Sequence, residues 1–383
     1  MRFGSFIIKN LLRRRFRSML TALGVAIAIA AVVALLGLAS GLRRSAAERF
    51  ESRGIDLVVL RAGIAQRLNS SLNQAIGGRL AQLKHVKGVA ACLTDMVSFD
   101  ETSYIGVPVH GWPADSFAYS SIHVTDGRQL RETDSGKVML GARLARDLGK
   151  KVGQTLQIEG SSFEVAAVYE GASMFDNSSA IVPLADLQRL MDRPEQVTEF
   201  QIAVTSAAEQ RKAAIEEMCH EIESLRGANG KLLGLAALPT EEFINKNTEI
   251  KLTDAMAWMT SAIALMIGSV GMLNTMVMSV LERTQEIGIL RAIGWRQGRI
   301  VWMVLCEAFL LSLIGAIMGV VFAIALTQSL ASFSPLQSYV RSDMSPLIIT
   351  SGFAMAALVA LVGGAYPAIR GARLPPTEAL RYE

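Results

Sequence analysis

The sequence predicts an α-helical membrane protein with four transmembrane helices and an α+β extracytoplasmic domain inserted between helices 1 and 2. The chain of 383 residues is 51% hydrophobic and only 19% charged. Its mean hydropathy of +0.35 is too high for a typical soluble protein of this length. Four long runs carry no charge, and one long polar stretch separates the first run from the second.

Each charge-free run is longer than the roughly 20 residues that a helix needs to cross the hydrocarbon core. A cleaved signal peptide is the competing interpretation of the first run, which is too long for one. We predict transmembrane helices at 18–41, 255–281, 300–331 and 346–369, with a periplasmic loop at 332–345.

Basic residues are densest before the first span and also follow the second and fourth spans. Because cytoplasmic flanks are enriched in Lys and Arg, we expect both termini in the cytoplasm and the large domain outside it. Residues 1–17 have the pattern of an amphipathic helix in the inner interface, and residues 370–383 form a cytoplasmic tail. These flanks account for the net charge of +4, so no nucleic-acid partner is expected. A smaller basic group lies on the opposite side of the first span, at Arg43, Arg44, Arg49 and Arg53.

The polar stretch at 42–250 is long enough to bury a core of its own. Alternating apolar segments predict strands and amphipathic segments predict helices, so the domain should be α+β. A Gly160-Ser161-Ser162 turn predicts a hairpin. The expected strands are 55–60, 89–99, 104–109, 155–158, 163–168 and 200–204, and the expected helices are 142–148, 184–191 and 207–225.

The segments beside the membrane, 42–53 and 240–253, are charged and contain no strong helix breaker after Pro239. We expect them to extend the first two spans as a helical stalk. A movement of the spans would then reach the outer domain as a rigid-body motion. A pair of flexible linkers is the alternative.

Residues 282–299 form a charged, helix-capable segment between two apolar runs, and we predict a cytoplasmic coupling helix there. Thr284 is expected to cap the first turn, in which the helix dipole favours Glu286. Gly294 is expected to end the helix after roughly two turns in the left-handed conformation.

This short helix should show an apolar ridge, because Ile287 and Leu290 are separated by helical spacing, as are Ile289 and Ile293. Such a ridge suits a groove in a partner protein, whereas an ordinary polar loop is the other interpretation. Charged residues flank the ridge at Glu282, Arg283, Glu286 and Arg291.

The motifs of catalysis are missing. Without a G-x-x-x-x-G-K-[ST] loop the chain should not hydrolyse ATP itself, and no serine-hydrolase or zinc-protease motif occurs, so a membrane enzyme has little support. The four histidines lack metal-ligand spacing, and neither a metal nor a cofactor on this chain is expected. Cys92 and Cys219 could pair in an oxidising compartment and Cys306 should stay single, although a structural or free role is favoured for all three.

Two features of the predicted spans allow more than one interpretation. Residues 37–41 and 315–319 both fit G-x-x-x-G, which serves either tight packing within the chain or a dimer contact. Placing the carboxylate of Glu307 at the edge of the third span would cost about 1 to 3 kcal/mol of membrane-insertion free energy if the carboxylate were unpaired. An arginine of the 283–299 segment is the favoured partner, and a proton or substrate contact is the alternative.

Two stretches carry a resemblance that extends over almost the whole chain. VMSVLERTQEIGILRAIGW at 277–295 and ARLPPTEALRYE at 372–383 resemble the signature and the C-terminus of the permease family that includes FtsX, LolC, LolE and the transmembrane part of MacB. The segments at 138–160, 163–170 and 180–190 resemble the MacB-type periplasmic core domain.

The resemblance implies a non-catalytic permease of the type VII ABC group in the bacterial inner membrane. It implies a homodimer, or a dimer with a close paralogue, that works with two separate ATPase subunits, which bind ATP and Mg. A separate ATPase is expected because MacB carries its ATPase domain ahead of the first span, where this chain has a short basic helix. The family's coupling helix corresponds to Glu282, Arg283, Glu286, Ile287, Gly288, Arg291, Ala292 and Gly294.

The resemblance also implies mechanotransmission, in which ATP-driven motion reaches the periplasmic domain through the stalk. The expected substrate is hydrophobic or amphipathic, such as a lipid, lipoprotein, peptide or drug, and a periplasmic adaptor and membrane lipids are expected partners. The alternative is an FtsX-like signal transducer that activates a periplasmic cell-wall hydrolase without transport.

Overall fold

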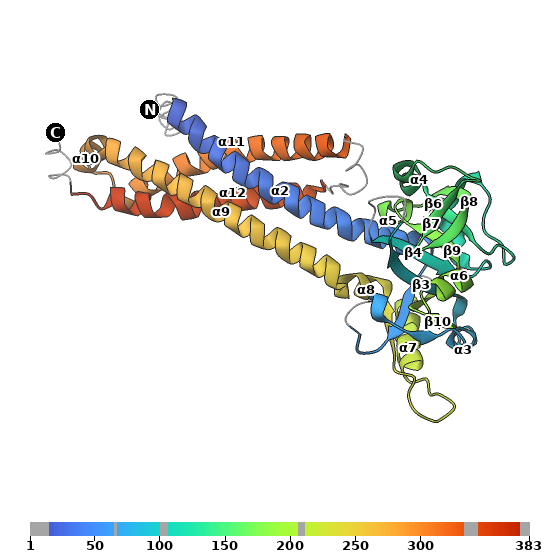
Figure 1. Ribbon diagram of the computed structural model, residues 1–383. Coiled ribbons are helices and arrows are strands. Elements are labelled where there is room, and N and C mark those ends of the chain that lie inside the picture. The colour runs from blue at the N-terminus through green and yellow to red at the C-terminus, as the bar shows by residue number, and fades with distance from the viewer. Residues whose placement is uncertain (1–14, 65–66, 100–105, 206–210, 333–343, 376–383) are drawn as a thin grey trace. The chain divides into compact units, whose positions relative to one another are not determined.

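The computed structural model describes residues 15–64, 67–99, 106–205, 211–332 and 344–375 (Figure 1). The chain divides into a helical unit, residues 1–41 and 252–383, and an inserted domain, residues 42–251. Most of the predicted interfacial helix, of the loop at 332–345 and of the C-terminal tail lies outside the described residues.

Within the described residues, four helices are long and apolar enough to cross a membrane, which confirms the predicted number of spans. The first, α2, has 38 residues and is therefore about 57 Å long, whereas the hydrocarbon core is about 30 Å thick. Helix α2 thus includes most of the first predicted stalk segment, 42–53. The four helices are α2 (Arg15–Ser52), α9 (Thr248–Glu282), α11 (Gln297–Ser332) and α12 (Pro346–Ala372).

Glycines bring the long helices of the helical unit close together. A Cβ atom on Gly315 of α11 would lie 2.9 Å from the carbonyl oxygen of Ala22 in α2, and one on Gly319 would lie 2.6 Å from that of Ala26. Both distances are too short for a side chain. The G-x-x-x-G motif at 315–319 therefore packs α11 against α2 of the same chain, which is the first of its two interpretations.

The inserted domain contains a sheet of ten strands among its described residues. The strands follow the order β12-β1-β11-β3-β4-β9-β6-β8-β5, and β7 pairs with β8. Their bounds are β1 Leu57–Arg61, β3 Val86–Val97, β4 Val107–Trp112, β5 His123–Gly127, β6 Lys137–Gly141, β7 Thr155–Ile158, β8 Ser161–Glu170, β9 Ala180–Pro183, β11 Glu199–Val204 and β12 Leu235–Pro239. A separate pair consists of β2 (Leu72–Asn73) and β10 (Gln196–Val197).

Strand β3 belongs to two halves of this sheet. Its residues 86–92 pair with β11, and its residues 93–97 pair with β4. We call β12, β1, β11 and the beginning of β3 the first lobe, and the remaining strands of the sheet the second lobe.

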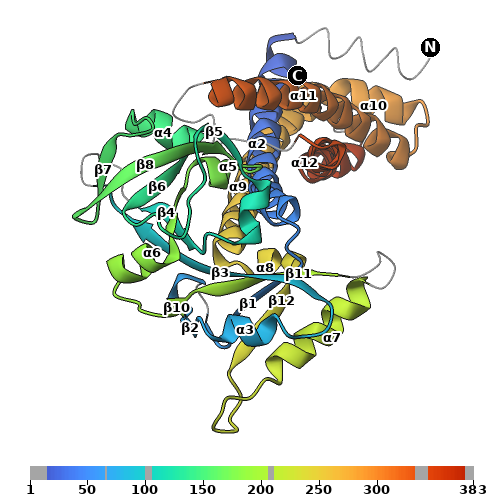
Figure 2. The same cartoon turned by 90° about the vertical axis from the view of Figure 1, so that its right-hand side faces the viewer.

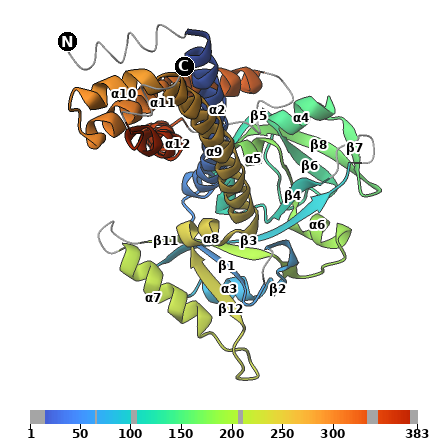
Figure 3. The ribbon, with the colours of Figure 1, turned by 90° about the vertical axis from the view of Figure 1, so that its left-hand side faces the viewer.

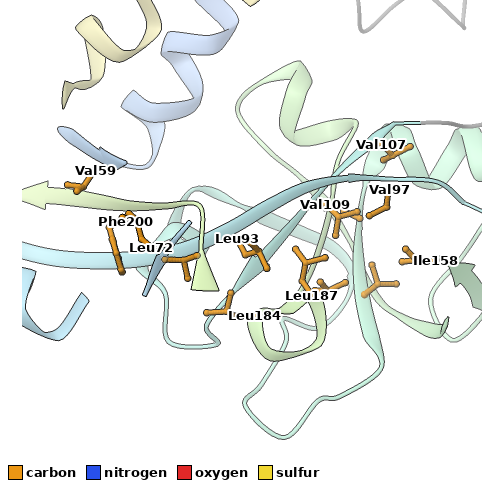
Figure 4. Packing of buried hydrophobic residues seen from close by; sticks show 14 of the residues in the cluster. Val59, Leu72, Leu93, Val97, Val107, Val109, Ile158, Leu184, Leu187 and Phe200 are labelled. Atoms are coloured by element: carbon orange, nitrogen blue, oxygen red, sulfur yellow. The ribbon is translucent and has the colours of Figure 1, made fainter. Parts of the chain in front are cut away.

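Short helices cover the sheet (Figure 2). Helix α7 (Arg211–Glu223) lies beside β12 in the first lobe, and α6 (Leu184–Leu190) lies against β4. The core beneath them is mainly aliphatic, with Leu93, Val109 and Leu187 among its members, and it also contains Phe99, Phe163 and Phe200 (Figure 4). The remaining helices are α3 Ile76–Leu80, α4 Ala142–Leu148, α5 Met174–Asn177 and α8 Thr240–Lys246, with 3-10 turns at Arg67–Asn69 and Phe117–Ser121.

The predicted α+β class is confirmed, and most of the predicted strands are present. The hairpin is formed by β7 and β8, with Glu159 and Gly160 at φ of 48° and 73° in its turn. Strands β6 and β9 were not predicted, because their residues are nearly all buried and show no alternation. Strand β4 begins at Val107, and residues 104–105 of the expected strand lie outside the described residues.

The second stalk segment is not one helix: residues 248–253 extend the second span as expected, whereas the expectation was wrong for 240–247. Helix α8 ends at Lys246, and α9 starts at Thr248. Between them the side-chain oxygen of Asn247 accepts hydrogen bonds from the backbone N–H groups of Glu249 and Ile250, at 2.9 and 3.3 Å. Asn247 therefore caps the beginning of α9 and separates the two helices.

We expect Gly319→Ala to lower the melting temperature of the purified chain by several degrees, because the added Cβ would meet the α2 backbone. Gly271→Ala is the matched control, since a Cβ at this position of α9 has no neighbour within 4 Å. Thermal unfolding in detergent measures both. Equal melting temperatures for the two variants would contradict the assigned packing role.

Candidate partner-docking site

The predicted coupling segment contains a short helix, α10 (Thr284–Ala292), which lies between α9 and α11 in sequence and beside α12 (Figure 3). Arg283, at φ −110° and ψ 15°, interrupts the helical path between α9 and α10. Helix α11 begins at Gln297, so the segment 282–299 holds a helix of nine residues and the first residues of the next one.

Thr284 does not cap α10, contrary to the prediction. Its hydroxyl donates instead to the carbonyl oxygen of Leu281 at 2.7 Å, and the residue at the capping position, Arg283, makes no side-chain capping bond. The carbonyls at the end of α9 lack helical partners, and a threonine hydroxyl one turn later can reach one of them. Thr284 thus ties the end of α9 to the start of α10.

The end of α10 agrees with the prediction. Gly294 has φ = 99°, and its N–H donates to the carbonyl oxygen of Arg291 at 3.0 Å. The N–H of Trp295 donates to the carbonyl oxygen of Leu290 at 3.1 Å. These two bonds form the Schellman motif, in which glycine takes the left-handed position without steric cost.

One side of α10 packs on the helical unit. Ile287 is 1% exposed, and Gly288 is buried as well. A Cβ on Gly371 of α12 would lie 2.7 Å from Val280 of α9 and 3.7 Å from Ile287, so α12 approaches both helices closely. Leu290 is half-buried against the same core.

The other side of α10 is exposed and partly apolar. Ile289 and Ile293 have 45% and 73% of their surface exposed. The predicted ridge is therefore divided: Ile287 and Leu290 anchor the helix, and Ile289 and Ile293 remain on the surface. The exposed positions recur at helical spacing on one face of α10. We call this face the docking face, and it consists of Gln285, Glu286, Ile289, Ala292 and Ile293.

Buried and half-buried ion pairs fix the junction between α9 and α10. Arg283 donates to Glu307 of α11 at 2.8 Å, and each side chain is 10% exposed. Glu307 therefore has the arginine partner that the sequence favoured. Glu282 binds Arg17 of α2 through two hydrogen bonds of 2.7 and 2.6 Å. Two consecutive residues thus connect the junction to two different helices.

The eight predicted coupling residues divide into three groups. Glu286, Ala292 and Gly294 are exposed, whereas Ile287 and Gly288 point inward. The other three hold the ends of α10 in place: Arg291 donates to the carbonyl oxygen of Trp295 at 3.2 Å, and the ion pairs of Glu282 and Arg283 are described above. The prediction missed Ile289 and Ile293 as site residues, although their spacing had indicated a ridge.

The chemistry of the remaining candidate groups is limited. All three cysteines are free thiols. Burial, together with nearby glutamates, raises the pKa of the Cys219 thiol to about 11, so Cys219 is not a reactive thiolate. The described residues contain no group of three His, Cys, Asp or Glu side chains that could hold a metal ion.

Two family models match the chain. A MacB-like periplasmic core domain matches residues 18–219, and an FtsX-like permease C-terminal region matches residues 258–376. The pyoverdine export ATP-binding/permease protein PvdT of Pseudomonas fluorescens is 31% identical, over 96% of this chain and 57% of its own length. An ABC transporter permease of Methanocaldococcus jannaschii is 25% identical, over 99% of this chain and 97% of its own length.

The chain thus spans less than three fifths of the length of PvdT. Among solved structures, the periplasmic region of MacB from Actinobacillus actinomycetemcomitans is 15% identical, with a TM-score of 0.39. It covers 51% of this chain and 95% of its own.

We expect Gly294→Val to destabilise the end of α10, because a β-branched residue resists φ = 99°. Amide hydrogen exchange of residues 290–295 should become at least tenfold faster. Gly298→Val is the control: the position is exposed, a Cβ there would meet no atom of another element within 4 Å, and the residue does not need positive φ. Unchanged exchange in the Gly294 variant would refute the Schellman ending.

We expect Glu307→Gln to cost about 3 kcal/mol of unfolding free energy, because Arg283 would keep a buried charge without a counter-ion. The double variant Arg283→Met with Glu307→Leu should regain most of this loss, since it removes both charges together. Denaturant unfolding of the purified chain measures the difference. A double variant as unstable as the single one would argue against a purely structural pair.

Proposed function

Because the chain belongs to the family of ABC transporter permeases that combine a MacB-like periplasmic core domain with an FtsX-like permease region, we propose that it is the non-catalytic, membrane-spanning subunit of an ATP-driven exporter. The ATPase, with its ATP and Mg, is proposed to reside on a partner chain, present in two copies. A second permease copy or a close paralogue completes the assembly.

The observation that carries this proposal is the docking face of α10. Two exposed isoleucines, Ile289 and Ile293, lie next to the carboxylate of Glu286 on a helix whose other side is fixed by Ile287. An apolar pair with an adjacent charge suits the groove of a partner protein, in which the isoleucines supply buried area and the charge supplies specificity. The proposed occupant is the ATPase, on the cytoplasmic side.

The contacts of α10 support a mechanical role. A push on the docking face would reach α11 through Arg283 and Glu307, and it would reach α2 through Glu282 and Arg17. Helix α2 continues without interruption to Ser52. We therefore propose mechanotransmission: ATP-driven movement of the ATPases displaces the membrane helices, and the inserted domain responds outside the membrane.

The proposed cargo is hydrophobic or amphipathic, such as a lipid, lipoprotein, peptide or drug, exported or extracted at the outer face of the inner membrane. PvdT is named as a pyoverdine export protein, and this similarity supports export as the direction of transport proposed for the present chain. A periplasmic adaptor is the proposed outer partner, and both termini are proposed to be cytoplasmic. An FtsX-like transducer that activates a cell-wall hydrolase is the alternative, and the match to the MacB-like core over residues 18–219 disfavours it.

The first test is a mild-detergent pull-down from the native host, with mass spectrometry and an ATPase assay of the eluate. An ABC ATPase recovered with an adaptor or lipid-modified cargo would support the exporter. An ATPase recovered with a cell-wall hydrolase would support the transducer. If no ATPase is recovered, the proposal fails.

We expect Glu286→Lys to weaken ATPase binding about tenfold and to abolish cargo-dependent ATP hydrolysis, because it reverses the charge on the docking face. The fold should be intact, since the position is exposed. Glu241→Lys is the matched control, as Glu241 is also an exposed glutamate in the first turn of a helix. Wild-type binding and hydrolysis by the Glu286 variant would remove α10 from the interface.

A further inference from the structure

Polar and charged side chains are buried around the last turn of α2, within the inserted domain. Arg49 lies in this turn, and Arg53 follows the helix directly. The side chains of Arg53 and Asp176 are 1% and 3% exposed, and that of Arg49 is 11% exposed. From the second lobe, His110 and Trp112 of β4 join them, each 1% exposed. Few charged groups are buried this deeply unless they are paired.

Asp176 of α5 is the acceptor at the centre of this cluster. Its Oδ1 accepts a hydrogen bond of 2.5 Å from Arg53 and lies 3.2 Å from Nε of Arg49. Its Oδ2 accepts from the hydroxyl of Ser173 at 2.8 Å, as part of a capping box at the start of α5. The carboxylate is therefore oriented by its own helix, independently of the two arginines.

The two arginines also contact β4. The guanidinium carbon of Arg53 lies 4.7 Å from the centre of the Trp112 ring, which is a cation–π contact. Arg49 Nη2 lies 2.7 Å from His110 Nε2. Because a guanidinium has no acceptor, Nε2 must accept this bond, and His110 is neutral with its proton on Nδ1, which donates to Thr94 at 2.9 Å.

The same end of α2 contacts the first lobe differently. Phe50 and Ile55 lie in an apolar cluster with Val58 of β1, Phe243 of α8 and Ile250 of α9. The rings of Phe50 and Phe243 are 5.5 Å apart in an edge-to-face arrangement. Apolar contacts are non-directional and tolerate small shifts. In contrast, a buried ion pair cannot separate without leaving a charge without its counter-ion.

We propose that Arg49, Arg53, Asp176 and His110 are positioning residues that lock the end of α2 to the second lobe. The second lobe then follows α2 when this helix is displaced, while the first lobe shifts on its apolar contact, and the shared strand β3 absorbs the change between them. The inference rests on the proposed function, in which ATP-driven movement reaches α2.

The test uses the full permease with its ATPase in lipid nanodiscs, and it measures the distance between spin labels on the two lobes. Suitable exposed positions are Glu217 of α7 and Ser162 of β8. In the wild type, the distance distribution should differ between the nucleotide-free and ATP-trapped complexes. Asp176→Asn should keep ATPase binding and ATP hydrolysis but lose more than half of this shift.

Asp134→Asn is the matched control. Asp134 is also a buried carboxylate of the second lobe, 6% exposed, and the hydrogen bond from Arg128 holds its pKa well below the usual range. Its ion pairs are with Arg128 and Lys137, which both lie in the second lobe, so loss of the Asp134 charge should leave the shift intact. Should the Asp176 variant not fold, Arg49→Gln, which leaves one arginine for the carboxylate, should reduce the shift, and Arg49→Lys should partly restore it.

The outcomes separate the two proposals. A wild-type permease that binds no ATPase would overturn the proposed function. A wild type that binds and drives ATPase without any change in the distance between the lobes would overturn the lock, as would a full shift in both the Asp176 and the Arg49 variants. Equal loss of the shift in the Asp176 and Asp134 variants would also overturn it, because general destabilisation would then explain the effect.

Discussion

The helical unit depends on the close packing of three helices around α2. Each of the other long helices has a glycine where α2 approaches: Gly268 of α9 opposite Ala28, Gly319 of α11 opposite Ile29, and Gly352 of α12 opposite Val33. Apolar burial gives helices no preference for one another over lipid tails, so backbone approach of this kind supplies the attraction through dispersion and shape. The central helix of the membrane part is thus also the helix that continues into the inserted domain.

Ion pairs occur where helices end or meet other elements. Arg17 with Glu282 and Arg283 with Glu307 fix the junction of α9 and α10, and Arg53 with Asp176 fixes the end of α2. Such pairs add little net stability, because removing charges from water offsets their attraction. Their value is geometric, since directional bonds define one arrangement of helices that apolar contacts alone would leave adjustable.

The sequence predicted the four spans, the inserted domain and the position of α10, because charge-free runs and helical spacing are local signals. The end of α10 at Gly294 was also predictable, since only glycine takes the left-handed conformation readily. The role of Thr284 was predicted wrongly: the same residue type can cap its own helix or bond back to the preceding turn, and the break at Arg283 decides between them. The local sequence pattern does not indicate the break in the helical path at Arg283.

The pairing of Arg53 with Asp176 could not be predicted, because 123 residues separate the partners in sequence and no spacing rule connects them. This contact also shows where part of the basic group after the first span lies. Of the basic residues that follow the first span, Arg49 and Arg53 are held inside the domain by Asp176, and Arg44 pairs with Glu48 one turn later.

The shared strand β3 has a further consequence for how the inserted domain folds. Because its first half pairs with β11 and its second half pairs with β4, unfolding of the whole strand would remove a neighbouring strand from both lobes at once. The two lobes should therefore form one cooperative folding unit in which partial unfolding is suppressed. A nascent chain in which β3 has paired with only one of these two strands would expose an open strand edge. Protection of that chain against aggregation depends on how quickly β3 pairs with the other strand.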